Sequence, residues 1–410
     1  MRPPLAALAR WRTPSLSARR TLLHGDPAPT PAAHHHHHHR GRRTLLTLAI
    51  ETSCDDTCVA VLSKSPGPRG RGTLHFNRKV TSDSTAYGGV YPPVALRSHD
   101  AHLAPLVAEA LASLPPVEEH PGGGGGGAIT VSGVPRQKPT FVTVTRGPGM
   151  SANLASGLAT AKGLAAAWQV PLVAVNHMQA HALTPRLVSA LDRSPPASSS
   201  SPIRPEYPFL TLLVSGGHTQ LVHSRSLADH RVLAASADVA VGDALDKAAR
   251  HILPHDMLAS HGDIHKIASS RAGGDDAMPL EERRCLARAA MRLLFEHLAS
   301  RVLLAFAARP ELGDAVRTLV VSGGVASNRF LMHVLRRTLD ARGFAHVELT
   351  APPPALCTDN AAMIAWTGME MYEAGWESAL SVRPERKWSI DPASDEGGIL
   401  GLGGWVRRDE

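Results

Sequence analysis

Two short apolar segments end in the same tetrapeptide pattern, and this repetition constrains the fold more than any other feature. Phe209 to Val214 leads into Ser215-Gly216-Gly217, and Thr318 to Val321 leads into Ser322-Gly323-Gly324. Short apolar runs bounded by glycine predict buried strands, and glycine lets backbone N–H groups approach a ligand closely. We therefore expect a duplicated α/β fold that closes on a phosphate-bearing ligand. The chain has no Gly-x-x-x-x-Gly-Lys-Ser/Thr segment, so this is not a P-loop protein.

The positive charge of the chain is concentrated at its beginning. Residues 1–43 contain eight arginines and one acid, Asp26, and so account for the whole formal net charge of +7. Their arginines interrupt every apolar stretch, which predicts a mitochondrial transit peptide and then a low-complexity linker rather than a secretory signal. A disordered basic tail is the alternative. The remaining residues carry equal numbers of acids and bases, so nucleic acid would have to bind at a local patch.

The rest of the composition is typical of a globular protein from a reducing compartment. Hydrophobic residues make up 43% and charged residues 19%, which is enough for a packed core. The four cysteines lack paired spacing, which argues against a disulfide framework or a zinc ribbon. No apolar run approaches the roughly 18 residues that a membrane helix needs, so we expect no membrane insertion.

Alternating apolar runs and helical patterns predict the other elements. Leu45–Ile50 and Cys58–Leu62 are expected to form a β-hairpin around an acidic turn. Further strands are expected at 140–145 and 171–175. Helices are expected over 94–114, 151–168, 281–308, from 329 through Leu339, and from about 359 onward.

His177 and His181 are the first candidate metal ligands. They are four residues apart, which places both imidazoles on one face if the segment is helical. Two nitrogens leave positions for a carboxylate and a substrate on a divalent ion. Met178 occupies the position of the glutamate base of a metalloprotease, which argues against that activity. On spacing alone, two histidines satisfied by hydrogen bonds are the alternative.

Several acidic residues each allow two interpretations. Asp359 precedes a predicted helix and is either a metal ligand or an N-cap. Asp55 and Asp56 lie in the hairpin turn, where they could hold a cation or orient a nucleophile, or could simply be solvated. Asp243 and Asp246 are each four residues before a basic side chain, which also fits a surface ladder of ion pairs.

Taken in chain order, eight short blocks resemble the Kae1/TsaD/Qri7 family of tRNA N6-adenosine threonylcarbamoyltransferases, and the basic leader points to its mitochondrial branch. The blocks span about residues 45–370, and they are Ala-Ile-Glu-Thr-Ser-Cys-Asp-Asp-Thr (49–57), Gly-Gly-Val-Tyr-Pro (88–92), Thr-Arg-Gly-Pro-Gly (145–149), Asn-His-Met-Gln-Ala-His (176–181), Val-Ser-Gly-Gly-His-Thr (214–219), Gly-Asp-Ala-Leu-Asp-Lys (242–247), Val-Ser-Gly-Gly-Val-Ala-Ser-Asn (321–328) and Cys-Thr-Asp-Asn (357–360).

The resemblance implies an actin/Hsp70/sugar-kinase-like α/β fold with two RNase H-like domains around a central cleft. After the leader at 1–43, the first domain is expected over 44–175, joined by a C-terminal helix at about 359–390. The second domain is expected over 176–358, and 391–410 would form a C-terminal tail.

The resemblance also implies roles for individual residues. His177, His181 and Asp359 match the ligands of one divalent metal ion per subunit, which could be Zn, Fe, Mn or Mg. Asp56 matches an acidic catalytic position. The positions that match the adenylate-binding residues are Leu213, Val214, Ser215, Gly216, Gly217, Asp246 and Asn328.

The implied reaction transfers an L-threonylcarbamoyl group from threonylcarbamoyl-AMP to N6 of adenosine 37, in the anticodon loop of mitochondrial tRNAs that read ANN codons. AMP is released. The implied partners are the tRNA, an upstream threonylcarbamoyl-AMP synthase and a second copy of the chain, in the mitochondrial matrix. Candidate cations for the tRNA are Arg97, Arg146, Arg186, Arg329, Arg336 and Arg337.

One segment departs from the family pattern. Residues 251–290 contain neither the Tyr-Pro-Gly-Gly-Pro-like nor the Phe-Ser-Phe-Ser-Gly-Leu-Lys-like element that members carry after the Asp-Lys helix. A catalytically impaired nucleotide-binding scaffold subunit is therefore an alternative function. An ATPase or kinase of the same superfamily is another, although the histidine pair argues against it.

Overall fold

The computed structural model describes residues 44–67, 69–87, 89–117, 127–192, 202–253 and 278–408. The expected leader at 1–43 lies outside these residues, as do residues 254–277 of the divergent segment. No helix of the described residues is long and apolar enough to cross a membrane.

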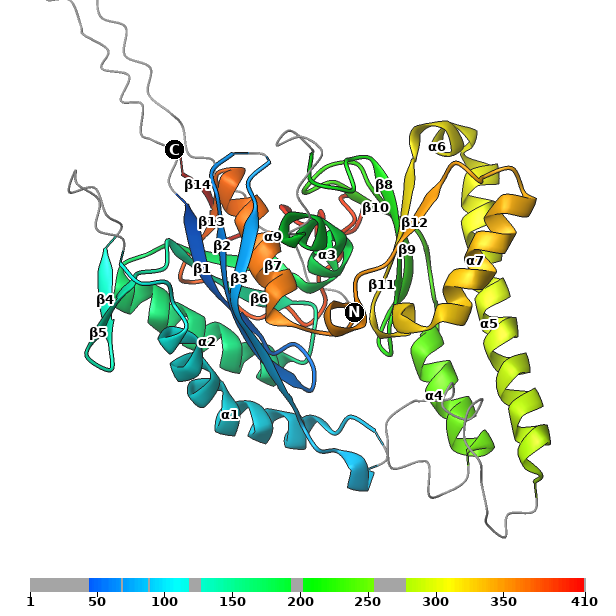
Figure 1. Ribbon diagram of the computed structural model, residues 1–410, viewed down its shortest axis with the longest axis horizontal. Coiled ribbons are helices and arrows are strands. Elements are labelled where there is room, and N and C mark those ends of the chain that lie inside the picture. Colours follow the sequence, from blue (N-terminus) through cyan, green and yellow to red (C-terminus); the bar gives the residue numbers. More distant parts are fainter. Residues whose placement is uncertain are drawn as a thin grey trace, which may run out of the picture. The chain divides into compact units, whose positions relative to one another are not determined.

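The first sheet has seven strands in the order β14-β13-β7-β6-β1-β2-β3 (Figure 1). Strands β1 and β2 pair antiparallel, as the hairpin prediction requires, and β2 pairs antiparallel with β3. Strands β1, β6 and β7 run parallel. The strand bounds are β1 Leu45–Glu51, β2 Asp56–Lys64, β3 Gly72–Thr81, β6 Phe141–Gly147, β7 Leu172–Asn176, β13 Trp376–Ser378 and β14 Trp405–Arg407.

The second sheet repeats the plan of the first. Its order is β10-β9-β8-β11-β12, with two antiparallel pairings followed by two parallel ones. Strand β8 therefore corresponds to β1, and β11 corresponds to β6. The bounds are β8 Phe209–Val214, β9 Thr219–Ser224, β10 His230–Ala235, β11 Thr318–Ser322 and β12 Glu348–Thr350; a separate hairpin joins β4 Ala128–Val131 to β5 Val134–Gln137.

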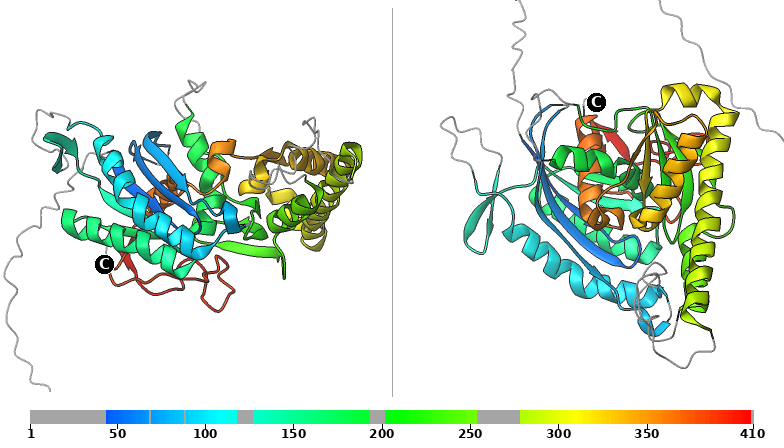
Figure 2. Two further views of the ribbon diagram at one scale, coloured as in Figure 1. Left: turned by 90° about the horizontal axis from the view of Figure 1, so that it is seen from below. Right: turned by 45° about the vertical axis from the view of Figure 1, so that its right-hand side comes forward.

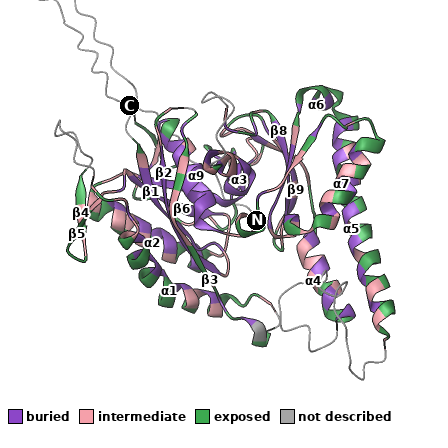
Figure 3. Ribbon diagram, in the orientation of Figure 1, coloured by how far each residue is buried: buried purple, intermediate pink, exposed green. Residues whose placement is uncertain are grey.

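Helices cover both sheets and form three hydrophobic cores. Helices α1 and α2 pack on one face of the first sheet, and α4, α5 and α7 pack on one face of the second. Helices α3 and α9 lie in a core that takes residues from both sheets, and Figure 3 shows them almost wholly buried. The bounds are α1 Pro92–Ala112, α2 Ser151–Trp168, α3 His177–Leu191, α4 Val241–Ile252, α5 Leu280–Ala308, α6 Pro310–Ala315, α7 Arg329–Ala341, α8 Pro354–Cys357 and α9 Ala361–Glu373, with 3-10 turns η1 Thr85–Tyr87 and η4 Gly324–Ser327.

The alternation of side chains explains how β1 can serve two cores at once. Leu46, Leu48 and Ile50 face the core of α1 and α2, whereas Ala49 faces the core of α3 and α9. Successive residues of a strand point to opposite faces. A strand covered on both faces appears in the sequence as an unbroken apolar run, which is why β1 could be found from the sequence.

The expected fold class is confirmed: this is an α/β chain of the actin/Hsp70/sugar-kinase type, built on two RNase H-like sheets. The repeated Ser-Gly-Gly turns have a different meaning from the one we expected. They are not equivalent positions of the two halves, because β8 and β11 are adjacent parallel strands of the same sheet. Their turns therefore lie side by side at one sheet edge.

The C-terminal region differs from the expected long helix and tail. Helix α9 ends at Glu373, and the chain then adds β13 and β14 to the edge of the first sheet. Residues between these strands also reach the interior, because Trp388, Ile390 and Ile399 are each at most 3% exposed. Figure 2 shows this last part of the chain, in red, running beneath the first sheet.

Candidate metal centre

The parallel strands of the first sheet bring two segments of the centre together. Strands β1, β6 and β7 end at the same sheet edge, with Glu51 as the last residue of β1 and His177 directly after β7. Helix α3 starts at His177 because Asn176 caps it, accepting hydrogen bonds from the backbone N–H groups of Met178 (2.9 Å) and Gln179 (3.1 Å). The expected helical placement of His177 and His181 is therefore confirmed.

The third segment of the metal centre, which contains Asp359, lies near the C-terminal end of the chain. Asp359 directly precedes α9, and Asn360, not Asp359, is the N-cap: its side chain accepts from the Met363 N–H at 3.0 Å. The alternative role of Asp359 as a helix cap is therefore wrong. Its carboxylate is left to face the histidines.

The three predicted ligands meet. His181 Nε2 lies 3.1 Å from Asp359 Oδ1, and His177 Nε2 lies 3.5 Å from the same oxygen. One ligand atom from each residue lies within 4.8 Å of the others. The two imidazole rings stand edge to face, with centroids 4.7 Å apart. Both histidines are buried, and the Asp359 side chain is 24% exposed.

Glu51 fixes the orientation of one histidine from behind. Its Oε2 lies 3.1 Å from His177 Nδ1 and also accepts from the Thr145 hydroxyl, and Oε1 accepts from the Ser53 N–H at 2.5 Å. A carboxylate at Nδ1 holds the proton on that nitrogen and directs the lone pair of Nε2 toward Asp359. Metal-binding histidines are usually held in this way.

The charges of the cluster call for a cation. In a neutral His177 that carries its proton on Nδ1, Nε2 and Asp359 Oδ1 would be two acceptors facing each other. Burial lowers the pKa of His177, but Asp359 and Glu51 outweigh it and raise that pKa to about 9. Burial raises the pKa of Asp359, but His177 and His181 outweigh it and lower it. A proton or a metal ion between these groups would relieve the repulsion.

The donor set fits a divalent metal ion. Two imidazole nitrogens and one carboxylate oxygen suit a borderline divalent ion and leave further positions open. His181 faces the cluster through Nε2, and its Nδ1 atom is buried without a hydrogen-bond partner among the described residues.

Asp56, the predicted catalytic residue, begins β2 near this cluster. Its Oδ2 accepts from Lys79 Nζ at 2.7 Å, and its Oδ1 accepts from the Thr81 hydroxyl. Lys79 also donates to Thr358 Oγ1 at 3.1 Å, so it links Asp56 to the loop of Asp359. Burial raises the pKa of Asp56, although Lys79 and Thr81 oppose that shift.

The predicted adenylate-binding residues lie in several places. Leu213 and Val214 are buried in β8, and the Ser215–Gly217 turn that follows exposes both of its glycines. A Cβ atom on Gly216 or Gly217 would meet nothing within 4 Å, so the protein itself does not require these glycines. A ligand that approaches their backbone would supply a reason for them.

Two other glycines allow the backbone to pack closely around the two Ser-Gly-Gly turns. A Cβ atom on Gly242, in α4, would lie 2.5 Å from the Ser215 carbonyl oxygen. A Cβ atom on Gly323 would lie 2.4 Å from the Val214 carbonyl oxygen, and the φ of Gly323 is +96°. The two Ser-Gly-Gly turns are thus in direct backbone contact.

Asp246 and Asn328 also have structural partners. Asp246 pairs with Arg250, and Asp243 pairs with Lys247 at 2.8 Å, so the predicted ladder of ion pairs exists on α4. Asn328 caps α7 by accepting from the Phe330 N–H at 2.9 Å. The Asp246 side chain is 34% exposed, and Asn328 is half-buried.

Sequence reasoning assigned no role to Glu51 or His218. Glu51 carried a usable signal, because a carboxylate that ends a buried strand is exceptional. His218 follows the first Ser-Gly-Gly turn; burial and the nearby His177 and His181 lower its pKa to about 4. Lys79 carried no signal, because its partners are 23 and 279 residues away.

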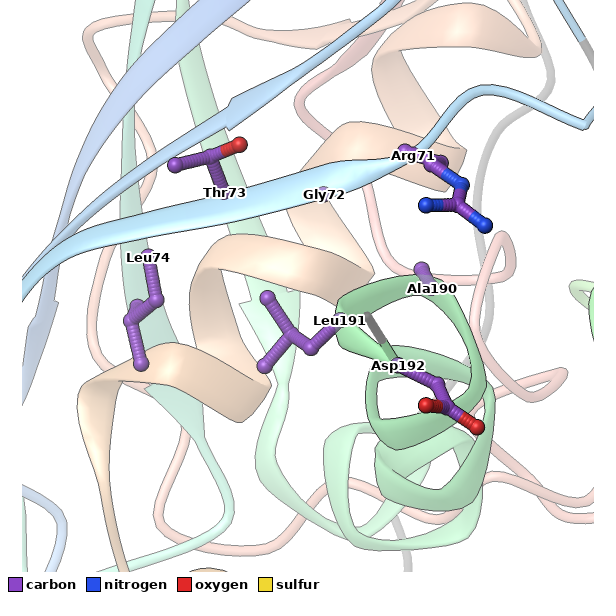
Figure 4. A pocket seen from close by; sticks show the side chains of 7 residues that line it. All are labelled: Arg71, Gly72, Thr73, Leu74, Ala190, Leu191 and Asp192. Atoms are coloured by element: carbon purple, nitrogen blue, oxygen red, sulfur yellow. The ribbon is translucent and has the colours of Figure 1, made fainter. Parts of the chain in front are cut away.

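A pocket of about 290 Å³ lies elsewhere, between the start of β3 and the end of α3 (Figure 4). It is lined by Arg71, Gly72, Thr73, Leu74, Ala190, Leu191 and Asp192. At ~1.5 Å per helical residue, this end of α3 is ~20 Å from His177. The pocket contains none of the predicted site residues.

Comparison with known proteins agrees with the geometry. Residues 75–366 match the family model described as TsaD, tRNA N6-adenosine threonylcarbamoyltransferase. The mitochondrial tRNA N6-adenosine threonylcarbamoyltransferase of Schizosaccharomyces pombe is 34% identical over 413 aligned positions, covering 89% of this chain and 90% of that protein. The tRNA N6-adenosine threonylcarbamoyltransferase of Rhodopseudomonas palustris is 33% identical, covering 85% and 94%.

A solved glucokinase from an Antarctic psychrotroph aligns with 80% of this chain and 99% of its own, at 12% identity and a TM-score of 0.41. The family model and the two relatives span most of the chain. The chain therefore belongs to the TsaD family of tRNA N6-adenosine threonylcarbamoyltransferases, and it is a transferase.

Proposed function

We propose that the protein transfers an L-threonylcarbamoyl group from threonylcarbamoyl-AMP to N6 of adenosine 37 in mitochondrial tRNAs that read ANN codons. The amine nitrogen forms a bond to the carbamoyl carbon, the bond from that carbon to the phosphate oxygen breaks, and AMP leaves. The observation that carries the proposal is the meeting of His177, His181 and Asp359 around one point, with Glu51 behind them.

Acyl transfer to an exocyclic adenine amine depends mainly on positioning, because that amine is a poor nucleophile. Holding it in line with the carbamoyl carbon supplies much of the acceleration. The first Ser-Gly-Gly turn exposes Gly216 and Gly217, and its backbone N–H groups would serve the phosphate and the negative charge that develops during transfer. We assign the donor to Leu213–Gly217, Asp246 and Asn328 on this basis.

Asp56 is our proposed acceptor for the proton that leaves N6. Its side chain is 10% exposed, and burial raises the pKa of its carboxyl group. Both oxygens already accept one hydrogen bond, from Lys79 and Thr81, which fixes the plane of the carboxylate. Each oxygen keeps a further lone pair for a proton.

The proposed metal ligands are His177 and His181 through Nε2 and Asp359 through Oδ1. When bound, a divalent ion at these atoms would offset negative charge on the departing phosphate. Zn, Fe, Mn and Mg all remain candidates for it. Glu51 keeps the His177 imidazole in the tautomer that can bind.

The relative from Schizosaccharomyces pombe bears a mitochondrial name, and we propose that this protein also acts in mitochondria, in the matrix. We further propose that it acts as a homodimer and receives its donor from a separate threonylcarbamoyl-AMP synthase. The basic leader composition supports the location.

The test supplies metal-loaded protein with threonylcarbamoyl-AMP and unmodified tRNA, and then measures modified adenosine in a nuclease digest. We expect product from the unchanged protein and neither bound metal nor product from the H177A/H181A variant. Product from that variant would refute the site. Tight adenylate binding without any product would support a scaffold subunit, and ATP hydrolysis would support a kinase-like activity.

A further inference from the structure

The arginines first considered for tRNA binding divide into two groups. Three of them, Arg146, Arg186 and Arg336, are buried or half-buried and are bonded to other groups of the protein. Arg146 is 5% exposed, and Arg186 pairs with Glu370 at 2.7 Å. Arg336 donates to the Val347 carbonyl at 2.7 Å. The other three, Arg97, Arg329 and Arg337, are exposed but lie on two different helices, α1 and α7.

A denser group of cations lies on one loop near the C-terminus. We call residues 383–387 the basic loop; it contains Arg383, Arg386 and Lys387, all of which are exposed. None of these three forms an ion pair with another described residue. The single acid of the loop, Glu385, is already held by Arg146 at 3.0 Å. The loop therefore presents three positive charges without local neutralisation.

The basic loop lies at the sheet edge that carries the metal centre. It packs on the turn after β6: the Glu385 N–H donates to the Arg146 carbonyl at 2.8 Å, and the Gly149 N–H donates to the Arg386 carbonyl at 3.2 Å. Gly147 is needed there because a Cβ atom would lie 2.0 Å from the Glu385 carbonyl oxygen. Strand β6 ends at the same edge as β1 and β7.

A second contact ties the loop to the metal centre itself. The residue after the loop, Trp388, accepts a hydrogen bond through its carbonyl oxygen from Asn176 Nδ2 at 3.1 Å. Asn176 directly precedes His177. Since neighbouring Cα atoms are about 3.8 Å apart, this contact places the Cα atoms of Lys387 and His177 within roughly 17 Å of each other.

Cations are also crowded on the other side of the loop. Lys162, on α2, donates to the Val382 carbonyl. Burial lowers the pKa of Lys162, and the positive charges of Arg146 and Arg383 lower it further. Positive charges that repel one another in this way are relieved when an anion binds beside them.

We propose that Arg383, Arg386 and Lys387 of the basic loop bind backbone phosphates of the tRNA and so hold its anticodon loop over the metal centre. This inference rests on the proposed function, from which it takes the substrate. The contacts are with phosphates, so they position the tRNA without reading its sequence. Because the chain after residue 43 has no net charge, such a patch supplies the attraction that the whole molecule lacks.

The test measures binding of an unmodified tRNA transcript to the full-length protein at several salt concentrations. The association constant K falls as salt rises, and each lost phosphate contact makes the slope of log K against log salt less negative by roughly 0.7 to 0.9. The slope of the variant R383Q/R386Q/K387Q should therefore be less negative than that of the wild type by about two to three. Its Kd should rise at least about tenfold at physiological salt. In the single variants R386Q and K387Q, the magnitude of the slope should fall by about one each.

A matched control removes exposed cations of another region. Arg288 and Arg301 lie exposed on α5, which packs on the second sheet. The variant R288Q/R301Q should keep the wild-type slope and Kd. AMP binding to each variant, measured by calorimetry, should equal that of the wild type, which shows that the loop variants are folded and that their donor site is intact.

The outcomes separate this inference from the proposed function. An unchanged salt slope in the loop variant, or an equal loss in the α5 variant, would overturn the role of the basic loop. The binding measurement needs no turnover, so a wild type that binds tRNA through the loop yet forms no product would refute the proposed function alone. In an active enzyme, the loop variant should raise KM for tRNA with kcat unchanged.

Discussion

Replacing Glu51 by glutamine is the most informative single change to the metal centre. The amide keeps the shape of the side chain but removes its charge. In the structure, Glu51 is fully buried and receives donors from His177, Ser53 and Thr145. The change therefore weakens the restraint on His177 Nδ1 without creating a cavity.

The expected magnitude follows from the contact with His177. A hydrogen bond to a charged group contributes about 1.5–3 kcal/mol, which corresponds to a factor of roughly ten to a hundred in binding. Loss of an outer-shell partner of a metal-binding histidine has a similar effect, about 10–100-fold. We therefore expect the E51Q variant to bind a divalent ion about 10–100-fold more weakly than the wild type.

The assay is competition with a chelator of known affinity, read as metal content of the recovered protein. E370Q is the matched control, because Glu370 is a similarly enclosed carboxylate that pairs with Arg186, away from the cluster. That variant should lose stability and keep its metal affinity. Equal metal affinity in E51Q and wild type would show that Glu51 does not orient a metal ligand.

Three further predictions concern single side chains. Lys79→Met should lower kcat roughly tenfold because Asp56 loses its charged partner, whereas Lys79→Arg should retain most activity; equal rates in both variants would contradict the link. Fully buried His230 has its pKa lowered to about 4, chiefly by burial. It therefore stays neutral in the folded state while it gains a proton in the unfolded state, and stability should fall by up to about 3 kcal/mol as the pH falls from 6.5 to 4. Chemical denaturation of His230→Gln across this range should show a smaller fall than the wild type. Gly323→Ala should lower the free energy of unfolding by at least about 2 kcal/mol, because φ is +96° and the new Cβ would strike a carbonyl of β8; Gly324→Ala, with ordinary space around it, should be close to neutral in the same measurement.

The sequence predicted best the elements that are buried on both faces. Strands β1, β2, β6, β8 and β11 lie between layers of helices and so appear as continuous apolar runs. Strand β3 lies at a sheet edge with a mostly half-exposed surface, and β10 is similar. Polar side chains interrupt the strand pattern of β3, and β10 has only a short apolar run after His230 and Arg231; neither was predicted.

The candidate site, like the fold, could be predicted only in part from the sequence. The pair His177 and His181 was visible because both lie on one helix, four residues apart. Asp359 could be joined to them only through the family resemblance, since 178 residues separate it from His181. The contacts of Lys79 and of Trp388 depend on tertiary structure alone, so no local pattern reports them.

Helix α9 is synthesised long after the strands that it covers, and this affects how the nascent chain folds. This helix fills one face of the first sheet, against strands that were synthesised some 300 residues earlier. Until then, the apolar strands β1, β2 and β6 lack the part of their cover that α9 provides, and pairing over such sequence separation is slow. A nascent chain in that state is prone to aggregate, so we expect it to need chaperones until α9 has been synthesised and packed. A chain truncated after residue 350 would lack α9 altogether and should remain prone to aggregate.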